Sequence, residues 1–172
     1  MNKKFRNILI AVVAVLVVCS CIFMFIISPI KPRTGNRKMP EADNQTGEIT
    51  SGVVVEQRFN NITENITEVA VVFSRAYTLD EATNMYIELL DGNAVLAQTV
   101  VNADSVEGSH RTYVKPSSPI SGMVGKELTL KIHTDSSAGT GLAVMYDSTD
   151  NSSFTFGSNT IKGTICFSVT GQ

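Results

Sequence analysis

Residues 85–101 read MYIELLDGNAVLAQTVV, two apolar runs that an Asp91-Gly92-Asn93 turn separates. Met85, Ile87 and Leu89 alternate with side chains that are less apolar. Successive side chains of a strand point to opposite faces, so this alternation predicts a strand with one buried face. An Asp-Gly pair between two such runs is a strong hairpin signal. The quoted stretch therefore predicts a β-hairpin.

Strands of the same texture are predicted on both sides of this hairpin. They are short, rich in β-branched and aromatic residues, and bounded by Gly, Ser, Asn and Asp. The predicted strands are Gly52–Phe59, Ile66–Ser74, Met85–Leu90, Ala94–Val101, Arg111–Lys115, Glu127–Thr134, Leu142–Tyr146, Ser153–Phe156 and Ile161–Val169. Such a series predicts an all-β domain over residues 48–172, built as a two-sheet antiparallel β-sandwich.

The segment before the hairpin carries a helix-start signal. Thr78 and Glu81 have the spacing of a capping box. Two interpretations stay open at this point. We favour a helical turn near Leu79–Thr83 that is followed by the strand; the alternative is a full helix over residues 79–90.

An uncharged apolar run of 20 residues, Ile8–Ile27, precedes the domain. A helix of this length spans about 30 Å at roughly 1.5 Å per residue, which is the thickness of the hydrocarbon core of a bilayer. Pro29 and Pro32 follow and are expected to end the helix. We predict a single-pass transmembrane helix that contacts membrane lipid.

The basic residues before this run suggest its orientation. A very short basic N-terminus before an apolar run is typical of an export signal, and long C-terminal domains cross membranes largely regardless of their charge. We therefore expect residues 1–7 in the cytoplasm and the domain at the outer side of the cell membrane. Ser28–Gly47 has three prolines and no apolar periodicity, which predicts a flexible stem.

Two other fates remain open for the apolar run. It could be a signal peptide that is cleaved before Cys21, or the chain could be a lipoprotein that carries lipid on Cys21. We favour the retained anchor because Ile22–Ile27 continues the apolar run past that point. The apolar region of a signal peptide is usually only about 7–15 residues long.

Charge and cysteine content exclude some partners and some means of stabilisation. From Glu48 onward there are 14 acidic and 7 basic residues. An acidic domain repels nucleic acid, so no nucleic-acid partner is predicted. Cys166 is the one cysteine of the domain, so apolar burial rather than an internal disulfide must stabilise the fold. Because it lies in an apolar strand, Cys166 is expected to be a buried, inert thiol.

The sequence carries no catalytic signature, and we predict no enzymatic activity. No Gly-x-Ser-x-Gly stretch occurs. Ser109 and His110 are adjacent, and adjacent residues of a strand point to opposite faces. Carboxylates are plentiful, but their spacing favours no particular pair for glycosidase chemistry.

The sequence signals for metal and cofactor sites are also weak, and no such site is predicted. The two histidines have no further ligand at metal-binding spacing. An oxygen-rich loop with Asp147, Asp150 and Asn151 could contribute to a Ca²⁺ site. The simpler interpretation of this loop is an Asx-type turn between strands.

The candidate ligand-binding residues are aromatic. Sugar-binding proteins stack sugar rings on exposed aromatic side chains, and this chain has four tyrosines and no tryptophan. The candidates are Tyr86, Tyr146, Tyr113 and Tyr77. Tyr86 is out of phase with the apolar positions of its strand and is expected to face outward. The alternative is that these rings are half-buried, with only the hydroxyl in water.

Two segments together resemble a known class of domain. They are the hairpin of residues 85–97 and the later strand GKELTLKI, residues 125–132. They resemble β-sandwich accessory domains of Gram-positive bacterial surface proteins, including domains attached to membrane-embedded sugar transferases and wall-polysaccharide proteins. Such domains are similar to jelly-roll carbohydrate-binding modules. The resemblance covers roughly Gly52–Thr170 and implies a jelly-roll sandwich, a cell-envelope location and a binding or accessory role, without catalytic residues.

These features predict a membrane-anchored, extracytoplasmic, non-catalytic binding module. Its expected ligand is a glycan of the cell wall or cell envelope. The alternative is a subunit of a membrane protein complex, in which the sandwich packs on a protein partner. A surface hydrolase is a minor alternative.

Overall fold

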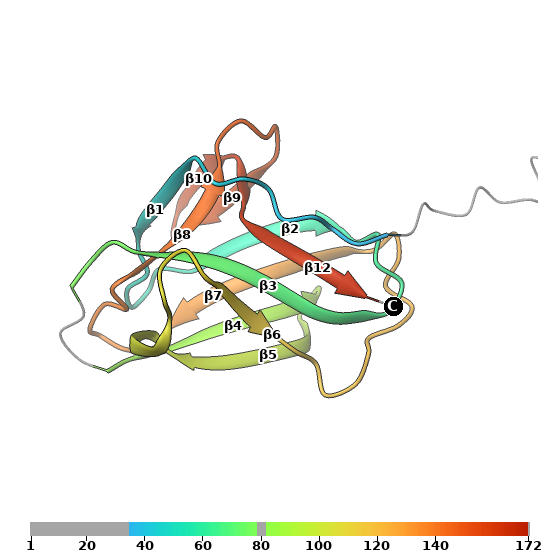
Figure 1. The fold of residues 1–172 in the computed structure, drawn as a ribbon, viewed down its shortest axis with the longest axis horizontal. Coiled ribbons are helices and arrows are strands. Elements are labelled where there is room, and N and C mark those ends of the chain that lie inside the picture. Colours follow the sequence, from blue (N-terminus) through green and yellow to red (C-terminus); the bar gives the residue numbers. More distant parts are fainter. Residues whose placement is uncertain (1–34, 79–81, 172) are drawn as a thin grey trace, which may run out of the picture. The chain divides into compact units, whose positions relative to one another are not determined.

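Two antiparallel β-sheets pack face to face in the part of the chain that the computed structural model describes, residues 35–78 and 82–171 (Figure 1). The fold is a β-sandwich, as predicted. Its elements are β1 (Asn44–Glu48), β2 (Val55–Asn60), β3 (Ile66–Arg75), β4 (Asn84–Asp91), β5 (Ala94–Asn102), the 3₁₀ turn η1 (Ala103–Ser105), β6 (Arg111–Val114), β7 (Glu127–Thr134), β8 (Leu142–Asp147), β9 (Ser153–Phe156), β10 (Asn159–Lys162), β11 (Thr164–Ile165) and β12 (Phe167–Gly171).

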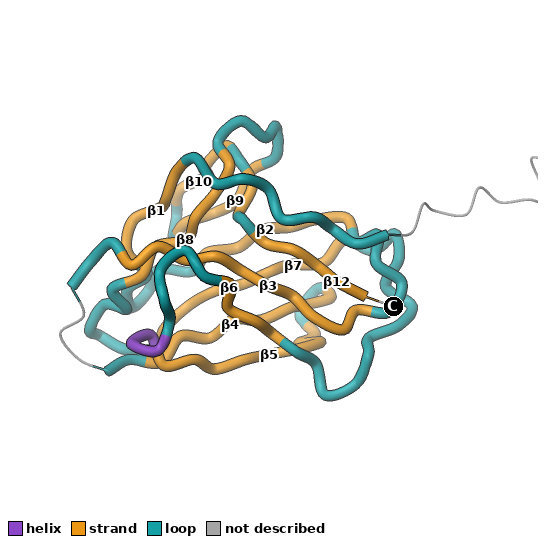
Figure 2. Tube along the Cα trace, in the orientation of Figure 1, coloured by secondary structure: helices purple, strands orange, loops and turns teal. Residues whose placement is uncertain are grey.

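The sheets differ in how regular they are. The second sheet has the order β10-β9-β2-β7-β4-β5. The first has the order β1-β8-β3-β12, with β11 paired to β8 and β6 paired to β3. Figure 1 shows the last strand, β12, beside β3, and the tube in Figure 2 shows η1 as a short purple turn.

Alternating apolar residues of the two sheets form the core, which confirms the predicted pattern. The inward side chains of β3, β4 and β7 are at most 1% exposed: Val69, Val71, Phe73, Met85, Ile87, Leu89, Leu128, Leu130 and Ile132. The predicted hairpin is also confirmed. β4 and β5 are joined by Gly92 and Asn93, and Gly92 has a φ of 58°, which glycine adopts at no steric cost.

The full helix over residues 79–90 is wrong, because β4 occupies Asn84–Asp91. Pairing of this strand with both β5 and β7 outweighs the local capping signal. Residues 79–81 of the favoured helical turn lie outside the described residues. Ala82 and Thr83 are not helical, and the Thr83 carbonyl accepts a hydrogen bond from the Ala103 amide.

The predicted strand Ile161–Val169 is divided into three. β10 pairs with β9 in the second sheet, whereas β11 and β12 belong to the first. The chain crosses between the sheets at Gly163, whose φ is 132° and where a Cβ would lie 2.5 Å from the Asp147 carbonyl oxygen. Only glycine fits this crossing, which is why one apolar run serves both sheets.

Residues 35–47, which the sequence assigns to the stem, lie along the sandwich instead. Arg37 and Val169 exchange two backbone hydrogen bonds of 2.9 and 3.1 Å, and β1 pairs with β8. The segment lacks apolar periodicity because most of it is loop on the surface, and the edge strand β1 has few buried side chains, Thr46 among them. The predicted transmembrane helix Ile8–Ile27 lies outside the described residues. Among those described, no helix is both long and apolar enough to cross a bilayer.

We expect a fragment that begins at Glu48 to be at least about 3 kcal/mol less stable than one that begins at Thr34. The shorter fragment loses the Arg37–Val169 bonds and most of β1, and each hydrogen bond contributes roughly 1 kcal/mol. Urea unfolding followed by circular dichroism measures the difference, since the chain has no tryptophan. Equal midpoints for the two fragments would show that residues 35–47 add nothing to the fold.

Candidate functional site

The outer face of the second sheet gathers polar side chains into one row across its six strands. Residues directly opposite each other on paired strands point to the same face. Glu88 of β4 lies between Gln98 of β5 and Lys131 of β7, and Lys131 lies opposite Glu56 of β2. The row continues through β9 and β10. We name it the polar row: Gln98, Glu88, Lys131, Glu56, Thr155 and Thr160.

Glu88 holds the middle of the polar row together. It is only 7% exposed. Its Oε1 accepts a 2.9 Å hydrogen bond from Gln98, while Oε2 lies 3.3 Å from the Lys131 Nζ and 3.6 Å from the His133 Nε2. A carboxylate removed from water needs such partners. These contacts fix side chains of three strands relative to one another.

Tyr86 lies beside the polar row on the same face, as its phase in the strand predicts. Its ring stacks on His133, with centroids 5.1 Å apart and ring planes 10° apart. Its hydroxyl donates a 3.1 Å hydrogen bond to Asp135, and this bond raises the pKa of Tyr86. Val100, which is 52% exposed, lies opposite Tyr86 on the neighbouring strand β5. An aromatic pair therefore borders the polar row.

A hollow of about 300 Å³ opens on this face near the β4–β5 turn. Glu56 and Lys131 of the polar row line it, together with Arg58, Thr129 and Asn93. The outer face thus combines an aromatic pair, a fixed row of hydrogen-bonding groups and a recess with charged walls.

The structure does not bring the four candidate tyrosines together. Tyr113 lies on β6 in the first sheet and is 43% exposed. Tyr77, which is 40% exposed, follows β3. Tyr146 on β8 is partly buried and packs edge-on against Phe154 at 5.1 Å, so it serves the core. Of the four, Tyr86 alone lies beside the polar row.

The candidate Ca²⁺ loop is made of Asx-type turns, which was the simpler interpretation. Oδ1 of Asp147 accepts hydrogen bonds of 2.8 and 2.6 Å from the Thr149 amide and hydroxyl. Oδ1 of Asp150 accepts a 2.7 Å bond from the Ser152 amide, which lowers the pKa of Asp150. Asn151 is exposed. Within residues 35–78 and 82–171, no group of three or more His, Cys, Asp and Glu could hold a metal ion.

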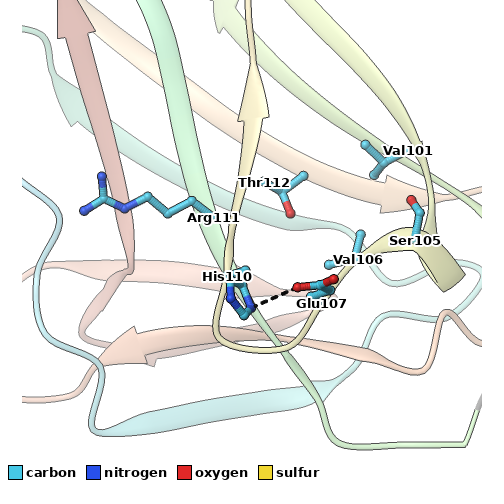
Figure 3. Close-up of a pocket in the computed structure, with 7 residues that line it drawn as sticks. All are labelled: Val101, Ser105, Val106, Glu107, His110, Arg111 and Thr112. Carbon is cyan, nitrogen blue, oxygen red and sulfur yellow. Dashed lines mark ion pairs between the residues drawn. The ribbon is translucent and has the colours of Figure 1, made fainter.

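A second cavity, of about 280 Å³, lies between η1 and β6 (Figure 3). Glu107 and His110 approach to 3.5 Å at its mouth, and their side chains are 78% and 72% exposed. Figure 3 shows that Arg111 points away from this pair. An exposed ion pair of this kind contributes little to the stability of the fold and does not orient a third side chain.

The polar row is what sequence reasoning missed. Glu88 and Lys131 are far apart in the sequence, and only the register between β4 and β7 makes them neighbours. The Asp-Gly turn signals that β4 and β5 pair, but it does not reveal which residues oppose each other. Neither a model of a known protein family nor a curated protein matches this chain.

We expect Cys166 to resist thiol reagents in the folded protein at pH 8. It is 1% exposed, and burial, with Asp147 and Asp43 nearby, raises its pKa to about 11. The thiol therefore stays protonated, and the thiolate is the reactive form. Peptide mapping after treatment with a disulfide reagent should find Cys166 unmodified in buffer and modified in guanidinium.

A matched control is Ser158→Cys, in the exposed turn between β9 and β10. This cysteine should react in buffer at the rate of a free thiol. Modification of Cys166 at a similar rate in buffer would contradict its burial.

Proposed function

We propose that this chain is a membrane-anchored, extracytoplasmic, non-catalytic module that binds a glycan of the cell envelope. The single observation that carries the proposal is the Tyr86–His133 stack beside the polar row. The anchor in this proposal is the apolar run Ile8–Ile27. The resemblance to accessory domains of surface proteins, with the jelly-roll topology that it implies, supports the same role.

The outer face of the second sheet has the chemistry that sugar binding requires. A sugar ring presents C–H groups on its faces and hydroxyls at its edge. An aromatic ring such as Tyr86 packs against the C–H groups, since the face of its π-system is negative and C–H groups are slightly positive. Carboxylate, amide and ammonium groups such as Glu88, Gln98 and Lys131 accept hydrogen bonds from the sugar hydroxyls or donate to them.

The rigidity of this face also favours binding. Immobilising a flexible side chain on binding costs roughly 0.5–1.5 kcal/mol. Glu88 already holds Gln98, Lys131 and His133 before any ligand arrives. A ligand that lies across these strands therefore meets groups whose positions are already set.

A protein partner is the second candidate, and the edge strand β5 favours it. β5 ends the second sheet, carries no charged residue, and exposes 52% of both Val95 and Val100. A long uncharged edge can pair with a strand of another chain. In this alternative the sandwich is a subunit of a membrane complex.

We expect replacement of Tyr86 by alanine to weaken binding of the domain to its glycan by roughly two- to tenfold. The loss of one stacked ring costs roughly 0.5–1.5 kcal/mol, and 1.4 kcal/mol corresponds to a factor of ten. A fragment of residues 34–172 would be screened on a glycan array and against purified wall polysaccharides, and each hit measured by calorimetry.

Tyr113→Ala is the control, because Tyr113 is an exposed tyrosine that lies in the first sheet, away from the polar row. It should bind like the unaltered domain, and circular dichroism would verify that both variants fold. Equal losses for the two variants would place binding elsewhere. A folded domain that binds no polysaccharide would favour the protein partner, to be sought by co-purification from membranes.

A further inference from the structure

A third cavity, of about 330 Å³, opens at the side of the sandwich where β2 is no longer paired with β9. β9 pairs with β2 only at Val55 and Glu56, and beyond this pairing the Arg37 guanidinium lies 5.7 Å from the centre of the Phe59 ring. The polar and charged side chains that line the cavity are Arg37, Gln57, Arg58, Asn60, Asp150, Ser152 and Thr164. Its size lies at the lower end of the range for small-ligand pockets, about 300–1,000 Å³.

Arg37 is a cation with too few partners. Its guanidinium carbon lies 4.3 Å from the centre of the Phe167 ring, which supports the group from one side. One terminal nitrogen donates a 3.1 Å hydrogen bond to the Thr164 hydroxyl. Its Nε is buried and has no hydrogen-bond partner among the described residues. Burial lowers the pKa of Arg37 from its usual value, and the charge of Asp150 acts in the opposite direction.

A bound anion would stabilise the Arg37 guanidinium. A partly buried charge is costly unless it is paired, and the planar guanidinium matches a carboxylate through two parallel hydrogen bonds. Arg58 lines the same cavity, and its own partner is Glu127 at 3.8 Å, with both side chains largely exposed. An exposed pair at this distance is weak, so Arg58 can turn toward a ligand at little cost.

Asp150 narrows the choice of anion. Its carboxylate lines the same cavity and attracts Arg37 electrostatically, yet the described structure has no ion pair between them. Two arginines and one aspartate leave a net charge of about +1, which a monoanion balances. A doubly charged phosphate would leave a net charge of about −1 in the cavity, and a zwitterion would leave the positive charge uncompensated.

We propose that this cavity binds the carboxylate of an acidic sugar, a uronic acid, with Arg37 and Arg58 on the carboxylate and Asp150 accepting from a ring hydroxyl. The exposed amide of Asn60 is a further partner for hydroxyls. Arg58 lines both this cavity and the hollow on the outer face, so the two are neighbours. The inference rests on the proposed function in taking a glycan as ligand, and it specifies that the glycan is acidic.

The test uses the full chain and three probes: sodium glucuronate, neutral methyl glucoside and inorganic phosphate. Nitrogen-15 NMR would follow the side-chain Nε–H signals of Arg37 and Arg58. We expect saturable shifts of these signals with glucuronate. Methyl glucoside should bind at least tenfold more weakly than glucuronate, and phosphate should also bind more weakly than glucuronate.

Three variants make the test specific. Arg58→Gln, on an exposed residue, should weaken glucuronate binding at least fivefold, and Arg37→Gln should abolish it. Arg111→Gln removes an exposed arginine outside this cavity and should change nothing. Arg37 also packs on Phe167, so circular dichroism would check folding, and the argument for the site relies on Arg58→Gln if Arg37→Gln unfolds.

These results test the acidic-sugar site independently of the proposed glycan-binding function of the outer face. Equal binding of glucuronate and glucoside, tighter binding of phosphate, or no effect of Arg58→Gln would overturn the acidic-sugar site. In any of these cases a neutral polysaccharide that loses affinity on Tyr86→Ala would still support the outer face as a glycan-binding surface.

Discussion

Burial of one face of each sheet against the other is the constraint on which the rest of this structure depends. Phe73, Ile87 and Leu130 come from three strands and are completely buried. Because side chains alternate along a strand, the residues between inward-facing positions must point to the outer face. Tyr86, Glu88 and Lys131 must then lie on the outer face. The candidate binding surface follows from how the core is packed.

The strands were predictable because alternation is a local property of the sequence. Register is not local. Glu88 meets Lys131, and Tyr86 meets His133, only after β4 and β7 have paired in one particular alignment. The role of Arg37 could not be predicted from the sequence for a different reason. It lies in an edge segment without apolar periodicity, so nothing in the sequence separates it from a solvated linker.

One irregularity decides the composition of the polar row. A regular hairpin closed by Gly92 and Asn93 would place Leu89 opposite Leu96 and Glu88 opposite Ala97. The pairing shifts by one residue after Leu90, so Leu89 lies opposite Ala97 and Glu88 opposite Gln98. A β-bulge of this kind re-aims side chains. Here it supplies the buried carboxylate with an amide donor.

The two ends of the described chain are neighbours, because the Gly171 amide donates a 2.9 Å hydrogen bond to the Asn36 side chain and Gly35 bonds to Ile62 (Figure 1). Adjacent ends of this kind allow circular permutation. A short linker from Gly171 to Gly35 would close the chain, and new ends could open at Gly92 and Asn93. Such a permuted domain would display its termini beside the outer face, where a reporter group could sense an occupied surface.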